Sequence, residues 1–396
     1  MSSRNRMLAA LRCQNKDQTP CSFMLFNALK ERSEDYLDFI ERQLKLGLDA
    51  FVQIPPRSPI VENDYYNLHG LPVSYAGSVE IHEWVDRQEG EKAPILVKEY
   101  HTPEGVLRTE VRKTGNWRWG NHVPFLDDYL VGRSKKFLID SRENLKALNY
   151  LLIEPSKSEV AEFKMLSQPV IEFAAQQDLL TAGGWGVGAD LIGWVYGLDR
   201  LVYAIYDTPD FIKELLEIIA AWNRKRMEVV LDYGVDLYIK RAWYENCDFW
   251  TPKKYREFIF PILKEDVRSA HHKGALFGYI ITSNCMPLLD MIAEAGVDVV
   301  IGIDPAHWDF DVALDKLGGK VCMWGGVNGH LTVERGSTAE VRSEVRQAMQ
   351  TLASSEGFIL SPVDNVRQDT QLAFENIEIL IDEWKKFSKG SSMGVR

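Results

Sequence analysis

The chain has 396 residues, of which 45% are hydrophobic and 26% are charged, and these proportions exclude a disordered, collagen-like or wholly coiled-coil protein. Its 46 Lys and Arg residues against 57 Asp and Glu residues give a net charge of −11, so it lacks the broad positive field that nucleic acid binding needs. The five cysteines are odd in number and have no CxxC or CxxH spacing, which indicates neither a disulfide framework nor a common zinc module.

The cysteines and the lengths of the apolar runs also indicate the compartment of the protein. Free thiols fit a reducing cytosol. The N-terminal segment lacks the long apolar stretch of a signal peptide, and no run reaches the ~18 to 20 apolar residues of a membrane helix. We therefore expect a soluble cytoplasmic protein with an N-terminal helix and no membrane association.

Segments rich in β-branched and aromatic residues alternate along the chain with amphipathic stretches, a pattern typical of parallel strands joined by crossover helices. Eight candidate strands lie at 20–26, 49–54, 179–185, 235–242, 274–280, 297–303, 320–326 and 357–361.

Helix-start signals punctuate the stretches between these strands. Thr208 before Pro209, and Thr251 before Pro252, each place a capping hydroxyl ahead of a proline at the first helical position. Ser337 forms a capping box with the glutamate three residues later. Each signal predicts the start of a separate helix.

Eight strands with helices between them predict a (β/α)8 TIM barrel, whose reactive groups gather at the carboxyl ends of the strands. A long interruption at about 60–178 contains KEYHTPEGVLRTEVRK, where alternation around Glu104 and Gly105 predicts a hairpin. We interpret the interruption as an insertion or lid. The predicted organisation is one barrel over 1–390 with a disordered tail at 391–396.

The loop RAWYENCDFW follows the fourth candidate strand and holds Arg241, Tyr244, Glu245 and Cys247. A carboxylate and a thiol this close can transfer a proton, or can bind a metal with a third ligand from another strand. The alternative is that Arg241 pairs with a neighbouring acid and Cys247 simply packs.

A second group follows the last strand, where Ser361, Asp364 and Asn365 share the loop SPVDNVRQDT. Asp364 before Asn365 also suits a tight turn, which is the alternative interpretation. The expected position at the barrel mouth favours a functional role.

Other strand ends offer side chains that can contact a ligand: Trp185, Tyr279, Asp304, Trp324 and Asn328. Tryptophans in 116–125 and 183–197 can wall a pocket for a planar apolar ligand, or can fill the core. For Asp304 the alternative is a cap on the turn that follows it.

Six segments together resemble the uroporphyrinogen decarboxylase superfamily: SRNRMLAALRCQNKDQTP, LIGWVYGLDRLVYAIYDTPDFIKELLEII, TPKKYREFIFPILKEDVRSAHHKG, PLLDMIAEAGVDVV, MWGGVNGHLTVERGSTAEVRSEV and GFILSPVDNVRQDTQLAFENI. That superfamily includes the tetrapyrrole decarboxylase and methyltransferases that exchange methyl groups with corrinoid proteins. The resemblance covers nearly the whole chain apart from about 55–175, and it implies a (β/α)8 barrel.

Two signature sites of that superfamily are altered here. The decarboxylases carry an arginine-rich segment after the first strand that holds the substrate carboxylates, and this chain offers Lys30 and Arg32. The methyltransferases carry a His-x-Cys zinc pair, whose positions fall on Ile280 and Thr282. We therefore predict no metal site and no tightly bound cofactor, and the alternative is a different zinc site that uses Cys247 and Cys322.

The resemblance and the residues together predict a corrinoid-linked methyltransferase that acts on a small or aromatic methylated compound, with a separate corrinoid protein as partner. Glu245, Asp364 and Arg241 are the predicted catalytic residues. The predicted substrate-binding residues are Trp185, Tyr244, Tyr279, Asp304, Trp324, Asn328, Ser361 and Asn365. The alternatives are a uroporphyrinogen decarboxylase and a small-molecule-binding barrel that has lost catalysis.

Overall fold

The computed structural model of the chain describes residues 1–56 and 69–388. The predicted tail at 391–396 lies outside the described residues. Seven of the eight predicted strands are confirmed, and they form one parallel sheet in the order β1-β6-β7-β8-β9-β10-β11. Their bounds are β1 Phe51–Ile54, β6 Leu180–Val187, β7 Leu237–Arg241, β8 Leu276–Ile280, β9 Val299–Ile303, β10 Cys322–Asn328 and β11 Phe358–Val363.

The predicted strand at 20–26 is the exception. It forms a single parallel bridge from Cys21 to Leu360, and the backbone N–H of Asp49, just before β1, donates to the carbonyl of Cys21. The ladder ends there because the next N–H in reach, that of Met24, donates instead to the Ser361 hydroxyl at 3.3 Å. The structure is therefore a curled seven-stranded parallel sheet with a short bridging segment beside β11.

Side chains on the inner face of the curled sheet form their own apolar cluster. Along β7, Leu237 and Ile239 belong to this inner cluster while Tyr238 belongs to the outer one, because successive strand residues point to opposite faces. Helix α1 (Ser3–Leu11), the expected N-terminal helix, contributes its apolar residues to the inner cluster and contacts β6 and β11. The carboxylate of Asp236, which precedes β7, holds Arg4 of α1 at 2.6 Å, so α1 closes the amino end of the sheet.

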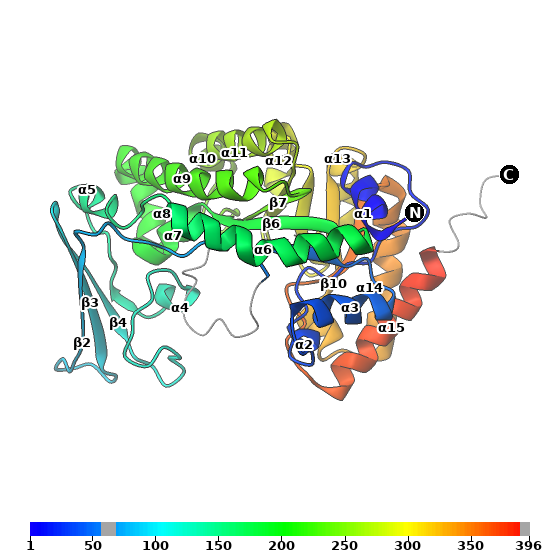
Figure 1. Cartoon of the computed structure of the whole chain (residues 1–396), viewed down its shortest axis with the longest axis horizontal. Helices are drawn as coiled ribbons and strands as arrows, with labels where there is room; N and C mark the ends of the chain where they lie inside the picture. The colour runs from blue at the N-terminus through cyan, green and yellow to red at the C-terminus, as the bar shows by residue number, and fades with distance from the viewer. Residues whose placement is uncertain (57–68, 389–396) are drawn as a thin grey trace.

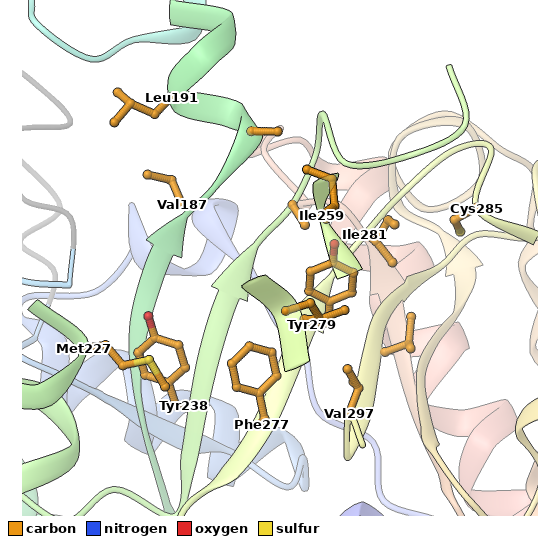
Figure 2. Close-up of a cluster of buried hydrophobic side chains, with 14 of the residues drawn as sticks. Val187, Leu191, Met227, Tyr238, Ile259, Phe277, Tyr279, Ile281, Cys285 and Val297 are labelled. Atoms are coloured by element: carbon orange, nitrogen blue, oxygen red, sulfur yellow. The ribbon is translucent and has the colours of Figure 1, made fainter. Parts of the chain in front are cut away.

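The outer face of the sheet is covered by helices, several of which lie together along one side in Figure 1. Figure 2 shows this outer layer, where Met227 of α9 reaches toward Tyr238, beside Phe277 and Tyr279 of the next strand. The helices after β6 are α7 Ala189–Val195, α8 Leu198–Asp207, α9 Pro209–Asp232, α10 Pro252–Phe258, α11 Phe260–His272, α12 Leu289–Ala295, α13 Phe310–Leu317, α14 Thr338–Thr351 and α15 Gln371–Ser388.

The three predicted helix starts are present, with one difference in their caps. Thr251 accepts a hydrogen bond from the Lys254 N–H, and Ser337 forms its capping box. The Thr208 hydroxyl does not cap α9, because it donates instead to the carbonyl of Ala204 at the end of α8. None of the helices in the described part of the chain is both long enough and apolar enough to cross a membrane.

The predicted insertion carries a separate antiparallel sheet in the order β2-β3-β4-β5, at the end of the molecule far from the N-terminus in Figure 1. Thr102 pairs with Gly105 across a tight turn, which confirms the predicted hairpin. These strands are β2 Glu80–Asp86, β3 Ile95–Thr102, β4 Gly105–Arg112 and β5 Ser134–Lys136. The helices that precede β6 are α2 Asn27–Lys30, α3 Tyr36–Leu46, α4 Asp128–Val131, α5 Asn144–Leu148 and α6 Lys157–Gln177.

Candidate functional site

A pocket of about 370 Å³, counting its solvent-open mouth, lies at the carboxyl ends of the parallel strands. Barrel enzymes place their active sites at this end of the sheet. Three tryptophans, several aliphatic side chains and a few polar groups line it: Met24, Leu25, Trp185, Trp243, Ile280, Thr282, Ile301, Gly302, Trp324, Ser361, Pro362, Val363 and Asp364. We call it the mouth pocket.

Backbone strain is concentrated around the mouth pocket. Trp185 and Asp364 both have a φ of 67°, and Ser283, next to the pocket residue Thr282, has a φ of 63°. A left-handed conformation is disfavoured for residues with a Cβ, and most strongly for bulky ones such as tryptophan. Such strain persists where the surrounding structure enforces it, which is common at functional sites.

Of the described residues that line the mouth pocket, Asp364 is the one that is ionisable. It follows β11, and its carboxylate accepts no hydrogen bond from the residues that the structure describes. Partial desolvation raises the pKa of the Asp364 carboxyl above its ordinary value; Arg367 and His330 oppose this shift and the Asp304 carboxylate adds to it. A carboxyl group with these properties is suited to donate a proton or to face a cationic ligand.

Trp324 and Ser361 form the floor of the pocket, and their polar atoms bind the backbone. The Trp324 indole N–H donates to the carbonyl of Ser22 at 2.8 Å. The Ser361 hydroxyl accepts from Met24 and donates to the carbonyl of Pro362 at 2.9 Å. Both residues are buried. They therefore offer a ligand contact surface rather than a hydrogen bond, and they hold the bridging segment in place.

Three other predicted binding residues form hydrogen bonds to neighbouring protein groups. Both carboxylate oxygens of Asp304 accept from the Asn328 amide at 3.0 Å, and one also caps the N–H of Ala306 at 2.9 Å. The Asn365 side chain accepts from the backbone N–H of Asn27 at 3.0 Å. None of Asp304, Asn328 and Asn365 lines the mouth pocket.

Arg241 is buried between two carboxylates that the sequence interpretation missed. Its Nε lies 2.8 Å from Asp190 on α7, and a terminal nitrogen lies 2.7 Å from Asp128 on α4 of the insertion. The Tyr244 hydroxyl also donates to Asp128, at 3.1 Å, and the Tyr244 backbone N–H donates to Asp190. Arg241 and Tyr244 thus join the insertion to the sheet instead of lining the pocket.

Burial raises the pKa of Asp190 to about 6, and Arg241 opposes the shift. The signal for Asp190 is its place in the tryptophan-rich segment that follows β6, beside Trp194, whose indole N–H also binds Asp128. No local pattern marks Asp128, because its partners lie more than 60 residues away in the chain.

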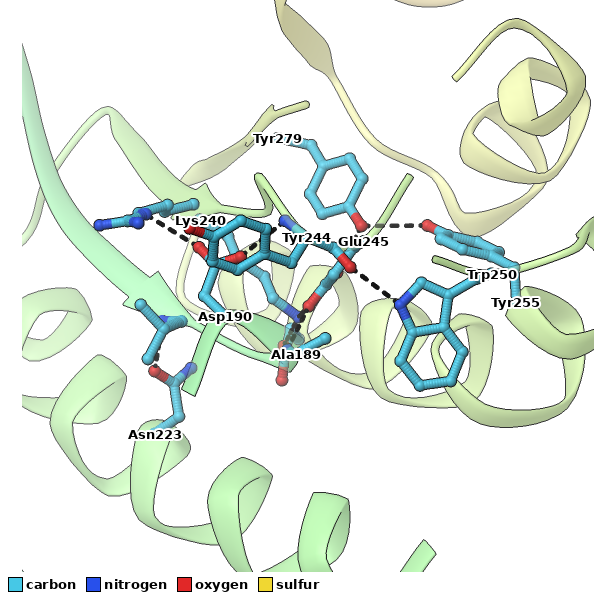
Figure 3. Close-up of polar contacts among 12 residues, drawn as sticks. Ala189, Asp190, Asn223, Lys240, Tyr244, Glu245, Trp250, Tyr255 and Tyr279 are labelled. Atoms are coloured by element: carbon cyan, nitrogen blue, oxygen red, sulfur yellow. Dashed lines mark hydrogen bonds and ion pairs between the residues drawn. The ribbon is translucent and has the colours of Figure 1, made fainter. Parts of the chain in front are cut away.

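Glu245 and Tyr279 lie in a second polar cluster, shown in Figure 3, which is separate from the mouth pocket. One Glu245 oxygen accepts from the Ala189 N–H at 3.0 Å, and the other accepts from the Tyr279 hydroxyl. Lys240 Nζ lies 3.8 Å from Glu245 and 3.0 Å from Asp266. All of these side chains are buried.

This cluster adjoins a narrow pocket between the sheet and helices α9 and α11, of about 260 Å³ when its solvent-open part is counted. Lys240 lines this pocket, and Tyr279 faces the same helix layer, because both residues alternate with inward residues on β7 and β8. The predicted catalytic role of Glu245 and the predicted binding role of Tyr279 are not supported, since both residues face the helix layer.

The cysteine candidates lie at opposite ends of the sheet. Cys247 is near Cys285, and burial raises the pKa of both thiols. Cys322 begins β10 and lies near Cys13 and Lys16 at the amino end. Cys247 and Cys322 therefore cannot share a metal ion.

The pocket residues do not fit the zinc ion that the resemblance implies. Ile280 and Thr282, at the zinc-pair positions, both line the mouth pocket, which contains no histidine or cysteine among its lining residues. Within 1–56 and 69–388, no three His, Cys, Asp or Glu side chains are grouped as metal ligands.

A curled seven-stranded parallel sheet covered by helices defines an α/β protein, and its mouth pocket lies at the carboxyl ends of the strands. The model of the Uroporphyrinogen decarboxylase (URO-D) family matches residues 177–387, which is more than half of the chain. The chain belongs to that family, and the resemblance predicted from its motifs is confirmed.

Two solved structures were compared with the fold of this chain. A methyltransferase from Methanosarcina mazei superposes with a TM-score of 0.61 at 15% identity, over 98% of this chain and 99% of that one. D-psicose 3-epimerase from Clostridium cellulolyticum H10 has a TM-score of 0.33 at 11% identity, over 64% of this chain and 93% of its own. The first comparison shows a shared fold, and the second is too distant to carry an argument. No curated protein sequence matches the chain significantly.

Proposed function

We propose that this protein is a methyltransferase that binds a small methylated compound in the mouth pocket and passes the methyl group to a corrinoid cofactor on a separate protein. Membership of the family and the fold shared with a methyltransferase support this proposal. The observation that carries it is the lining of the mouth pocket, which has three indoles, several aliphatic side chains and a single carboxylate. Such a lining suits a small, largely apolar substrate.

The same lining disfavours uroporphyrinogen, whose many carboxylates require cationic partners. No lysine or arginine is among the described residues that line the pocket. Arg241 is held by Asp128 and Asp190, and Arg32 donates to Asp369 at 2.7 Å outside the pocket. These two arginines are therefore committed to other carboxylates.

When the methyl donor is a neutral methyl ether, Asp364 supplies the proton that its leaving oxygen needs. The bond between the methyl carbon and oxygen breaks, and its electron pair stays on oxygen, which needs the proton. Partial desolvation raises the pKa of the Asp364 carboxyl, and this direction of shift favours its protonated form. The corrinoid, when its protein docks, supplies the nucleophile that accepts the methyl group.

We also infer that the bridging segment at 20–26 fills the eighth position of a closed (β/α)8 barrel. Its hydrogen bonds to Leu360 on one side and to the Asp49 N–H on the other support this inference. The mouth pocket, which includes Met24 and Leu25 of this segment, would then be enclosed on all sides.

The test supplies purified protein with reduced cobalamin and a panel of methyl ethers and methylamines, and follows methylation of the cobalt by its absorbance change. We expect transfer from at least one compound, and an approximately 100-fold slower transfer from a methyl ether for Asp364→Asn. Asp369→Asn is the matched control, because Asp369 lies outside the pocket and pairs with Arg32. Carbon dioxide release from uroporphyrinogen without any methyl transfer would replace the proposal with the decarboxylase alternative.

A further inference from the structure

We propose that the mouth pocket is an aromatic cage for a cationic methyl group, so that the substrate is a quaternary ammonium or sulfonium compound. This inference rests on the proposed function and names its substrate class. It depends on the placement of three indoles and on the charges around them.

The three tryptophans reach the pocket from different walls of the curled sheet. Trp185 lies on β6 and Trp324 on β10, and β7, β8 and β9 separate these two strands in the sheet. Trp243 follows the end of β7. Three indoles thus line one small pocket from several walls, and binding sites for methylated cations are commonly built from aromatic side chains in this way.

The charges at the mouth also favour a cation. Among the described residues that line the pocket, Asp364 is the charged one, and the neighbouring Asp304 accepts from the neutral amide of Asn328. Arg367 and His330 are the described cations that act on Asp364, and the His330 ring binds Glu334 at 2.9 Å. Within the described part of the chain, the Asp364 and Asp304 carboxylates favour a cation over an anion at the pocket.

Trp243 already contacts a cation that is not among the residues lining the pocket. The guanidinium carbon of Arg241 lies 3.7 Å from the centre of the Trp243 ring, and Arg241 is not among the pocket residues. Asp128 and Asp190 hold this arginine in ion pairs, so its charge is balanced locally. The Arg241 contact therefore orients the indole without making the pocket positive.

A cationic methyl donor changes what Asp364 must do. When a methyl group leaves an onium nitrogen or sulfur, the bond's electron pair stays on that atom, which departs as a neutral amine or sulfide. The corrinoid of the partner protein supplies the electron pair of the new bond to carbon. No proton is needed, so Asp364 acts as a counter-ion to the bound cation.

The test measures binding without any methyl acceptor, by isothermal titration and tryptophan fluorescence. The probes are choline, tetramethylammonium and 3,3-dimethyl-1-butanol, which replaces the choline nitrogen with an uncharged carbon. We expect choline to bind at least 10-fold more tightly than the neutral alcohol. Trp243→Leu should weaken choline binding by about 5- to 30-fold, and Trp243→Phe by less, because phenylalanine keeps an aromatic face.

Asp364→Asn should weaken choline binding and leave the neutral alcohol unaffected, while Asp369→Asn should change neither. Trp243 is only half-buried, and circular dichroism confirms that each variant is folded. Equal affinity for choline and the alcohol, or no binding of any cation, would overturn the cage. Selective cation binding without methyl transfer would support the cage and refute the proposed function. Methyl transfer from neutral ethers, with no preference for cations in binding, would support the proposed function and refute the cage.

Discussion

The mouth pocket and the cluster around Glu245 contain similar residue types, but their environments differ. Glu245 is buried, accepts two hydrogen bonds and lies near Lys240. Asp364 is open to solvent on a strained backbone and accepts no hydrogen bond from the described residues. A satisfied buried carboxylate stabilises the fold, whereas an unbonded one beside a pocket is available to a ligand. The comparison teaches that surroundings, and not residue type, separate structural from functional acids.

Two isosteric substitutions test most directly whether the two carboxylates differ in role. Glu245→Gln should lower the free energy of unfolding by about 2 to 3 kcal/mol, because a buried charge-assisted network loses its carboxylate. Asp364→Asn should change it by less than about 0.5 kcal/mol, since Asn also tolerates the left-handed backbone. Urea denaturation measures both, and equal losses would show that the two carboxylates do not differ in role.

A second test probes how tightly the Glu245 cluster is packed. A Cβ added at Gly188 would lie 2.0 Å from a Glu245 carboxylate oxygen, so Gly188→Ala should cost about 1 to 3 kcal/mol of stability. Gly132→Ala is the matched control, because nothing lies within 4 Å of its added Cβ and its φ is −89°. Thermal melts of both variants measure this loss of stability. If Gly188→Ala is as stable as the wild type, the Glu245 cluster rearranges at little cost to accept the added Cβ.

Asp127 is intermediate between Glu245 and Asp364. Its side chain is buried, but the arginine that it pairs with, Arg118, is largely exposed. Burial raises the pKa of Asp127 to about 6. The folded protein then holds this proton more tightly than the unfolded chain does. Stability contributed by Asp127 should therefore fall as pH rises from about 4 to about 6, by on the order of 1 kcal/mol per pH unit at most.

Asp127→Asn should remove that decline and keep the N-cap bond to Tyr129. The measurement is the difference in unfolding free energy between wild type and variant at several pH values. A difference that does not vary between pH 4 and 6 would contradict the raised pKa.

Much of the fold was predictable from the sequence because local patterns set it. Seven strands and the hairpin at Gly105 lie where the apolar runs and turn residues predict them. The bridging segment at 20–26 could not be assigned in this way. Its ladder ends where the Ser361 side chain competes for a backbone N–H, and that contact spans 337 residues.

The candidate site was predictable only in part. Trp185, Trp324, Ser361 and Asp364 line the mouth pocket as expected, while Tyr279 does not. A strand buried on both faces reads as a continuous apolar run, so the sequence of β8 does not reveal which residues face inward. Only the packed structure shows that Ile280 faces the pocket.

By itself, the sequence determined the family, the order of strands and helices, and the strand ends at which a site would form. Periodicity, caps and turns are local, so they can be read along the chain. The tertiary structure decided which acid is available to a ligand, which arginine is neutralised, and which tryptophans meet. Those properties depend on burial and on partners far apart in the chain, as when Asp128 of the insertion binds Arg241 of the sheet.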